Sequence, residues 1–270
     1  MELASGTIMK MKSSLSDKGD VSYSLPLGGT LTPMNDFLGK KVTLSWNKKI
    51  YDIYDGEPIK KSYAQGHSYK NLIKLPQCDT CIVRPELCHF DKGTCRDPEW
   101  GQKNCMIPHY IYLSITSGVK IGITRETQLP TRWIDQGAVK AIPVAKVGDR
   151  KTSGLIEIEI AKEMADKTNW RNMLKGVYED ANLEMMREQI YDSYGDLLDD
   201  MDAEEVEDSE TIINYPILSL PEKISSMSFD KSDIIEGTLT GIKGQYLIFD
   251  NGVINMRKHQ GYDITLNVEG

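Results

Sequence analysis

The chain has 270 residues, of which 40% are hydrophobic and 27% charged, and its formal net charge is −8. This composition predicts a packed globular protein and argues against a disordered chain. No stretch approaches the roughly 18 apolar residues that a membrane-spanning helix needs. The N-terminus has no apolar segment behind a basic start, so we expect no secretory signal and a cytoplasmic location.

The negative charge is concentrated in one segment. Residues 179–210 contain fourteen Asp or Glu and one Arg, whereas residues 119–175 contain eleven Lys or Arg and seven Asp or Glu. The protein is therefore mildly basic outside an acidic arm. A basic body could bind nucleic acid, and an ordinary solvated surface explains the same charges equally well. The acidic arm leaves open a third interpretation, an adaptor that binds other proteins.

Residues 1–75 are expected to be rich in β structure. In Lys41–Trp46, the side chains of Val42, Leu44 and Trp46 fall on one face of a strand. Glycines and a proline before this strand indicate turns. We expect a small antiparallel sheet or half-barrel.

The end of this region is basic and aromatic. Residues 59–74 carry four lysines and no acid, interleaved with tyrosines and His67. Lysines attract phosphates and aromatic rings stack on bases, so the segment is a candidate nucleic-acid surface. The alternative is a basic loop or short helix with Leu72 and Ile73 packed into the core.

All five cysteines lie within residues 76–108. They are Cys78, Cys81, Cys88, Cys95 and Cys105. The spacing Cys78-x-x-Cys81 turns two thiolates towards one tetrahedral metal ion, and nearby glycines and prolines allow the chain to reverse. In a reducing compartment such thiols favour metal binding over disulfides. We predict a structural Zn²⁺ site in this segment.

Five thiols exceed the four places around a tetrahedral zinc ion, and the pattern leaves open which four bind. His89 and His109 are further candidate ligands. Buried reduced cysteines without metal are the alternative. A redox pair is disfavoured, because no βαβ pattern surrounds the C-x-x-C motif.

Residues 109–195 predict a small α/β core. Two strands, Tyr110–Ser114 and Val119–Thr124, precede a short helix that begins at Thr131 and a strand over residues 139–147. Three more helices follow.

The first of these helices begins near Ser153, the second follows Thr168 as its N-cap, and the third covers residues 183–197. Residues 196–211 are too acidic to pack and are expected to form a linker. Residues 212–270 return to β structure, with Asp-Asn-Gly as a strong hairpin signal.

The stretch Gln77–Lys175 resembles an uncharacterised bacterial and archaeal family, the domain of unknown function numbered 2797. The resemblance rests on the segments CDTCIVRPELCHF, GTCRDPEW, HYIYL, VKIGITR, PTRWIDQGA, SGLIEIEIA and ADKTNWR. It implies no established activity. The family tends to carry a second cysteine knuckle upstream, and here Asp52, Asp55, Ser68 and Asn71 stand roughly where those cysteines would fall. We expect hydrogen bonds or packing to hold this loop in place of a second zinc ion.

The core is also similar, more loosely, to the GIY-YIG nuclease superfamily, which has a small sheet flanked by helices. Tyr110–Tyr112 resembles its first motif and Lys120–Gly122 its second, with a lysine in place of the motif's tyrosine. Arg132 falls at the position of the family's helix arginine, and Glu157 at that of its metal-binding glutamate.

This resemblance implies phosphodiester cleavage. Tyr112 would position or deprotonate the attacking water, with Lys120 in place of the second tyrosine. Arg132 would hold the phosphate, and Glu157 would bind one Mg²⁺. The alternatives are structural, a surface salt bridge for Arg132 and a core tyrosine for Tyr112.

We therefore expect an α+β protein in which a zinc-binding cysteine knot joins a small GIY-YIG-like α/β core, flanked by N- and C-terminal antiparallel β segments. The expected function is binding of DNA or RNA, with metal-dependent phosphodiesterase or nuclease activity. The alternative is a non-catalytic RNA- or ribosome-associated module in which zinc is purely structural. Cleavage requires Tyr112, Arg132 and Glu157 to meet at one pocket.

Overall fold

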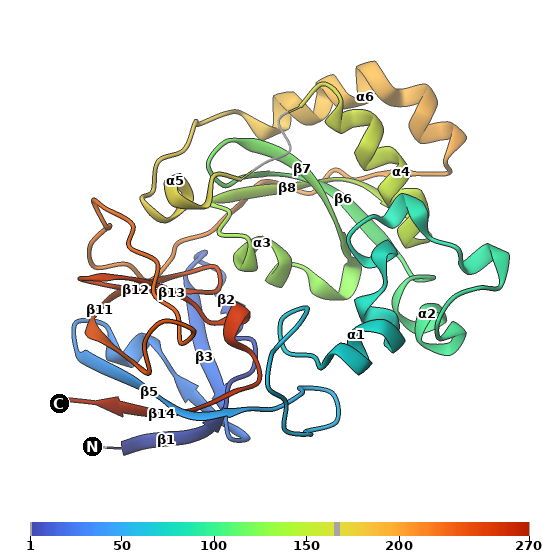
Figure 1. Cartoon of the computed structure of the whole chain (residues 1–270). Helices are drawn as coiled ribbons and strands as arrows, with labels where there is room; N and C mark the ends of the chain where they lie inside the picture. The colour runs from blue at the N-terminus through green and yellow to red at the C-terminus, as the bar shows by residue number, and fades with distance from the viewer. Residues whose placement is uncertain (1, 165–167, 270) are drawn as a thin grey trace.

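The computed structural model describes residues 2–164 and 168–269. It is a mixed α+β structure with several antiparallel sheets. Figure 1 shows a β-rich unit that holds both chain ends, a second sheet with helices above it, and the cysteine segment to one side. No helix among the described residues is long and apolar enough to cross a membrane.

Both ends of the chain build the β-rich unit. Its larger sheet has the strand order β1-β14-β5-β11-β12-β13. The strands are β1 (Glu2–Thr7), β5 (Lys41–Ile50), β11 (Ile234–Lys243), β12 (Tyr246–Phe249), β13 (Gly252–Asn255) and β14 (Tyr262–Val268). Because β14 pairs antiparallel with both β1 and β5, the two flanking β segments form one sheet. The predicted hairpin is confirmed between β12 and β13.

A second sheet of the same unit contains β2 (Lys12–Leu15), β3 (Val21–Leu27) and β4 (Thr30–Pro33). Alternate residues of β3 enter the core that the two sheets share, as a half-buried strand requires. Val42 and Leu44 of β5 are buried there as predicted, whereas Trp46 is half-buried.

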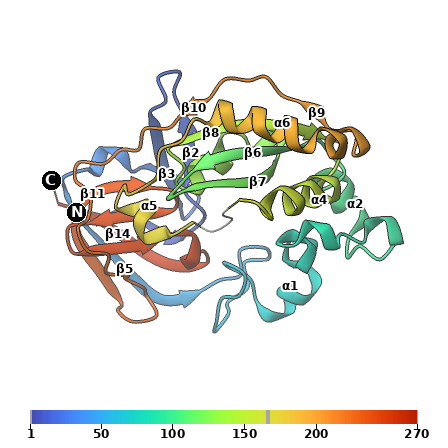
Figure 2. The ribbon, with the colours of Figure 1, turned by 90° about the horizontal axis from the view of Figure 1, so that it is seen from above.

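The second part is a sheet with β6 (His109–Ile115) between β7 (Val119–Arg125) and β8 (Lys140–Val147), all antiparallel. Helices α4 (Arg150–Ala161) and α6 (Leu183–Asp200) cover one face of it (Figure 2). The other face looks towards α3 and the β-rich unit (Figure 1).

The alternation of β6 explains this two-sided packing. Ile111, Leu113 and Ile115 belong to the core under α4 and α6. Tyr112 points the other way and packs edge-on against Trp133 of α3 (Thr131–Asp135), with ring centroids 6.0 Å apart. The strand therefore joins two cores and places Tyr112 between them.

Two helix starts differ from the prediction. Helix α4 begins before Ser153, because the Asp149 carboxylate caps it by accepting two backbone amides of the first turn. Helix α5 (Trp170–Leu174) is capped by the Asn169 side chain, so the assignment of its cap to Thr168 is wrong. The Thr168 hydroxyl instead lies 2.9 Å from that of Thr116.

The acidic segment packs along β8. Helix α6 continues into it, and β9 (Glu204–Glu205) and β10 (Thr211–Ile212) both pair with β8. Arg187 of α6 donates to two backbone carbonyls of this segment, at 2.9 and 2.7 Å. This arrangement differs from the unpacked linker expected over residues 196–211, because backbone pairing does not require apolar side chains.

Candidate functional site

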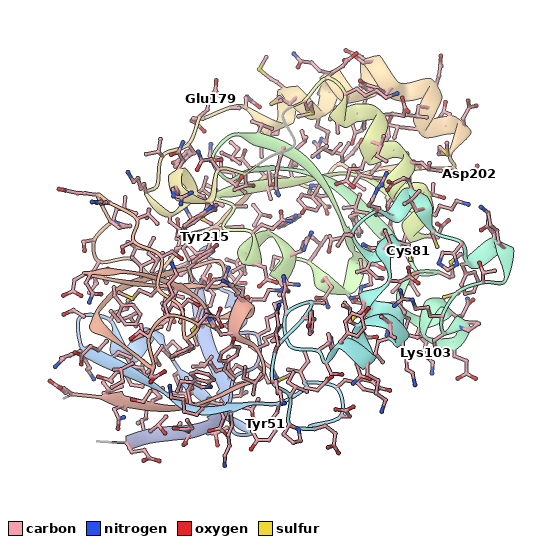
Figure 3. The ribbon with its side chains drawn as sticks, viewed as in Figure 1. Tyr51, Cys81, Lys103, Glu179, Asp202 and Tyr215 are labelled. Carbon is pink, nitrogen blue, oxygen red and sulfur yellow. The ribbon has the colours of Figure 1, made fainter. Side chains whose placement is uncertain are left out.

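The cysteine segment consists of short turns rather than long regular elements. Between α1 (Tyr69–Lys74) and α2 (Pro98–Asn104) the chain forms only 3-10 turns. Cys105 is buried, and the other cysteines are half-buried. Figure 3 labels Cys81, which lies where this segment meets the core sheet. A loop-rich segment with little core of its own needs a further staple.

Four of the five cysteines line one small cavity. They are Cys81, Cys88, Cys95 and Cys105. The cavity is tight, since a Cβ at Gly101 would lie 3.2 Å from the Cys95 Sγ. Burial, then Asp79 and the neighbouring thiols, raise the pKa of Cys81 to about 11. Thiols that repel one another in this way ionise together only beside a cation, which is a donor chemistry that Zn²⁺ accepts. Among the described residues, however, no three of the cysteine sulfurs lie within 4.8 Å of one another.

Cys78 lies outside this cavity. Burial raises the pKa of its thiol, and its charged neighbours are Arg96 and Asp52 rather than the other cysteines. The predicted Cys78-x-x-Cys81 pair thus places one thiol in the cavity and one beside it.

A second group of donors shares Cys81 with the cavity. The ligand atoms of Asp79, Cys81 and His89 lie within 4.8 Å of one another. However, Asp79 already accepts the Arg96 Nε at 2.7 Å, and the His89 Nδ1 lies 2.8 Å from the Thr94 hydroxyl. The His89 Nε2 faces Asp79 at 3.6 Å, so this group converges more closely than the four thiols do. Cys81 belongs to both sets of candidate metal ligands.

His109, the other histidine considered, is buried in β6 away from the cysteine cavity. Its Nδ1 lies 2.7 Å from the Ile107 carbonyl oxygen. Burial lowers the pKa of His109 to about 4, so the ring is neutral at pH 7. We assign it a structural role.

Hydrogen bonds hold the upstream loop, as predicted. The buried Asp52 carboxylate accepts the Ser68 amide at 2.6 Å and the Asn71 side chain at 2.7 Å. Asn71 also donates to Asp55 at 2.8 Å. Burial would raise the pKa of Asp52, but these donors and the Tyr54 amide outweigh burial and lower it to about 2. The side chains of Asp52, Asp55 and Asn71 thus form one hydrogen-bonded cluster with the Ser68 amide.

A pocket of about 540 Å³ lies between the core sheet, the cysteine segment and the β-rich unit. Six basic and two acidic side chains line it, a local balance of +4 in a chain of net charge −8. They are Lys10, Lys120, Arg125, Arg132, Arg150, Arg257, Asp135 and Glu157. The pocket is therefore cationic, whereas the segment of residues 179–210 is strongly acidic.

Three of these arginines have an unsatisfied buried atom. The Nε atoms of Arg132, Arg150 and Arg257 are buried without a hydrogen-bond partner in the described part of the chain. Burial lowers the pKa of Arg150 and of Arg257. Neighbouring guanidinium groups lower both further, Arg125 and Arg132 acting on Arg150 and Arg132 on Arg257. Buried guanidinium donors without acceptors lower the stability of the folded protein, and repulsion between them adds to this cost. A bound anion would remove both effects.

Tyr112 lies beneath this pocket. It pairs with Gly122 across β6 and β7, and a Cβ at Gly122 would lie 2.8 Å from the Tyr112 hydroxyl. The hydroxyl donates to the Gln136 side chain at 3.0 Å and also interacts with Arg132. Tyr112 is fully buried, and burial raises its pKa. It can orient Gln136 and Arg132, both of which line the pocket.

The cysteine segment forms one wall of the pocket through Ile82, Val83 and Pro85. Arg150 donates to the Ile82 carbonyl at 2.6 Å. A Cβ at Gly154 of α4 would lie 2.5 Å from the Cβ of Pro85, so a glycine is required at this close approach. The fold of the cysteine segment thus determines where Arg150 points.

The basic segment 59–74 approaches the same pocket at Gln65. Tyr69 is 61% exposed, and its ring lies 5.7 Å from that of Tyr63, over which the Lys61 ammonium sits at 5.2 Å. The short helix of the alternative interpretation is present as α1, but Ile73 is 53% exposed rather than packed into the core, and Leu72 is half-buried.

The structure brings the predicted residues Lys120, Arg132 and Glu157 to one pocket, whereas Tyr112 is fully buried beneath it and does not line it. Sequence reasoning missed the other cations there. Arg125 could have been found at the end of the predicted strand β7, whereas Lys10, Arg150 and Arg257 stand in no motif.

A family model described as "Protein of unknown function (DUF2797)" matches residues 39–264. The match includes the cysteine segment, the core sheet and the cationic pocket except Lys10. No curated protein and no solved structure matches the chain. Because the match extends over well more than half of its length, the chain belongs to the DUF2797 family.

Proposed function

We propose that this protein binds nucleic acid through backbone phosphates in the cationic pocket and hydrolyses a phosphodiester bond with Mg²⁺, on a GIY-YIG-like core. One observation carries the proposal. Arg132, Arg150 and Arg257 line one pocket, and the Nε of each is buried without a hydrogen-bond partner among the described residues. Phosphate oxygens are strong acceptors, and their negative charge balances the positive charge of the guanidinium groups.

Each residue has a role that its position supports. Arg132 binds the phosphate and stabilises the charge that grows on it as water attacks. Lys120 on β7 adds a second cation beside it. Tyr112, being buried with a raised pKa, positions Gln136 and Arg132 rather than removing a proton.

We assign Mg²⁺ to Glu157 because it lines the pocket and falls at the position of the metal-binding glutamate in the GIY-YIG resemblance. The other pocket acid, Asp135, forms an ion pair with Lys10 and accepts the Gln245 side chain at 2.8 Å. A single carboxylate suits Mg²⁺, which is commonly held by one or two carboxylates together with substrate phosphates and water. When bound, the ion would stabilise the leaving oxygen as the bond from water to phosphorus forms and the ester bond breaks.

Zinc has a structural role in this proposal. Cys81, Cys88, Cys95 and Cys105 would hold one ion, as tetrahedral thiolate sites do. The ion would fix the turns that carry Ile82 and Pro85, and through the Ile82 carbonyl the position of Arg150.

A second candidate is a non-catalytic RNA- or ribosome-associated module with the same phosphate contacts. The observation in its favour is the burial of Tyr112, which leaves its hydroxyl no direct access to an attacking water. Both candidates require nucleic-acid binding, and only the first requires cleavage.

The test uses full-length protein with labelled single-stranded and structured DNA and RNA, with and without Mg²⁺. Glu157→Gln should abolish cleavage and retain binding. Glu159→Gln is the matched control, because Glu159 lies on the same helix but outside the pocket, paired with Lys162. Binding without cleavage by the wild type would establish the second candidate. If Arg132→Gln binds as tightly as the wild type, both candidates fail.

A further inference from the structure

The cationic pocket has a second arm that belongs to the β-rich unit rather than to the core sheet. Arg257 begins the 3-10 helix η7 (Arg257–His259), between β13 and β14. Lys10 follows β1, and both residues line the pocket together with Arg132 of α3 and Glu157 of α4. Residues far apart in sequence thus complete one site.

The two cations of this arm differ in their partners. Lys10 forms an ion pair with Asp135. Arg257 makes no such pair among the described residues, and its buried Nε has no hydrogen-bond partner. Asp135 attracts the Arg257 guanidinium and Arg132 repels it. The β-rich unit therefore brings an unneutralised guanidinium towards the arginine proposed to hold the reacting phosphate.

The size of the pocket suits more than one phosphate. Its volume of about 540 Å³ falls in the range of roughly 300–1,000 Å³ found for sites that enclose drug-sized molecules. Two guanidinium groups that line such a space and repel each other, those of Arg132 and Arg257, match an acceptor that carries charge at two places.

We propose that Arg257 binds a second phosphate of the same nucleic-acid strand, beside the phosphate held by Arg132. The site then recognises an internal stretch of the phosphodiester chain rather than a free or terminal phosphate. This inference rests on the proposed function and adds its substrate class. In this proposal the β-rich unit, through Arg257, makes the protein prefer a continuous nucleic-acid strand over a single phosphate.

The test measures binding of a fluorescently labelled ten-nucleotide DNA strand by anisotropy, over a series of salt concentrations and without added Mg²⁺. Chelators are left out so that zinc stays bound. Arg257→Gln should weaken binding by roughly tenfold, the loss expected for a charge-assisted hydrogen bond. It should also reduce the salt slope by about 0.7, the contribution of one phosphate contact on a single strand.

Lys258→Gln is the matched control. Lys258 is the next residue of η7, its side chain is 66% exposed, and it does not line the pocket. This variant removes the same charge and should leave the affinity and the salt slope unchanged. An equal loss in both variants would show a general effect of charge and overturn the inference.

The outcomes separate the two proposals. If Arg132→Gln lowers the salt slope and Arg257→Gln does not, the second phosphate site is excluded while the proposed function stands. If the wild type does not bind the strand at all, the proposed function itself fails.

A competition experiment needs no variant and covers the case in which Arg257→Gln does not fold. A thymidine dinucleotide and a thymidine trinucleotide, both without terminal phosphates, are compared as competitors of the labelled strand. The trinucleotide, with two internal phosphates rather than one, should compete at least about tenfold better. Equal competition would overturn the inference.

Discussion

Two neighbouring loop-rich regions of this protein are held in different ways. The loop around Asp52 and Asn71 closes on itself through hydrogen bonds at 2.6–2.8 Å. The segment around Cys81 and Cys95 instead gathers four half-buried or buried thiols around one cavity.

The two regions differ in whether their hydrogen-bond donors and acceptors are paired. In the Asp52 loop one carboxylate faces amide donors, and the pKa of Asp52 falls to about 2 because they stabilise its charge. In the cysteine cavity burial, then Asp79 and the neighbouring thiols, raise the pKa of Cys81 to about 11. Protein donors satisfy the charge in the first region, and we propose that a zinc ion satisfies the thiolates of the second.

Loss of zinc should have the largest effect on this comparison. Cys88→Ser should release the ion and lower the free energy of unfolding by more than about 3 kcal/mol, because structural zinc contributes folding energy directly. Native mass spectrometry and urea unfolding measure the two effects. Binding of the labelled DNA strand should weaken as well, since Arg150 donates to the Ile82 carbonyl of this segment.

Cys78→Ser is the control for that experiment, because Cys78 lies outside the cavity. It should keep one zinc ion per chain and near-normal stability. Zinc loss in Cys78→Ser with retention in Cys88→Ser would exclude the four-thiol ligand set.

Removing the centre of the hydrogen-bonded loop should have the next largest effect. Asp52→Ala leaves the Ser68 amide and the Asn71 side chain without an acceptor and should cost about 3 kcal/mol. Asp55→Ala is the milder comparison, expected to cost about 1 kcal/mol, because Asp55 is exposed. Urea unfolding of the zinc-loaded proteins measures both. Equal losses would show that Asp52 is not the centre of the cluster.

Much of the local structure was predictable, because alternation and turn residues act over short distances. The strands β6, β7 and β8 and the β12–β13 hairpin follow from such patterns. The hydrogen-bonded loop was expected instead from the family resemblance, because polar residues stand where relatives carry a second cysteine knuckle. The residues that share the pocket with Arg132 were harder to predict from the sequence. Arg257 and Lys10 enter the pocket only because β14 pairs with β1 and β5, a long-range choice that local patterns do not encode. The backbone pairing of the acidic segment escaped prediction for a similar reason.

Acid should weaken the Asp52 loop in a defined range of pH. The folded-state pKa of about 2 lies below the ordinary value of 3.8, so the carboxylate stabilises the fold fully above about pH 4. That contribution, about 2.5 kcal/mol, is lost as the pH falls towards 2. The measurement is the difference in unfolding free energy between the wild type and Asp52→Asn at pH 5 and at pH 2.5. The difference should shrink on acidification, since loss of zinc affects both proteins alike, and a constant difference would contradict this account.

The smallest expected change in stability is also the most direct test of the comparison. Cysteines placed together at positions 52, 55, 68 and 71 should restore a second zinc site, because three of the four native side chains already converge within hydrogen-bond distance. Native mass spectrometry should then show two zinc ions per chain, and the unfolding free energy in excess zinc should stay within about 1 kcal/mol of the wild type, since the metal replaces the lost hydrogen bonds. Chelation should destabilise this variant more than the wild type. A variant that folds with a single zinc ion would show that the loop geometry suits hydrogen bonds alone, and that the two regions are not interchangeable solutions to the same problem.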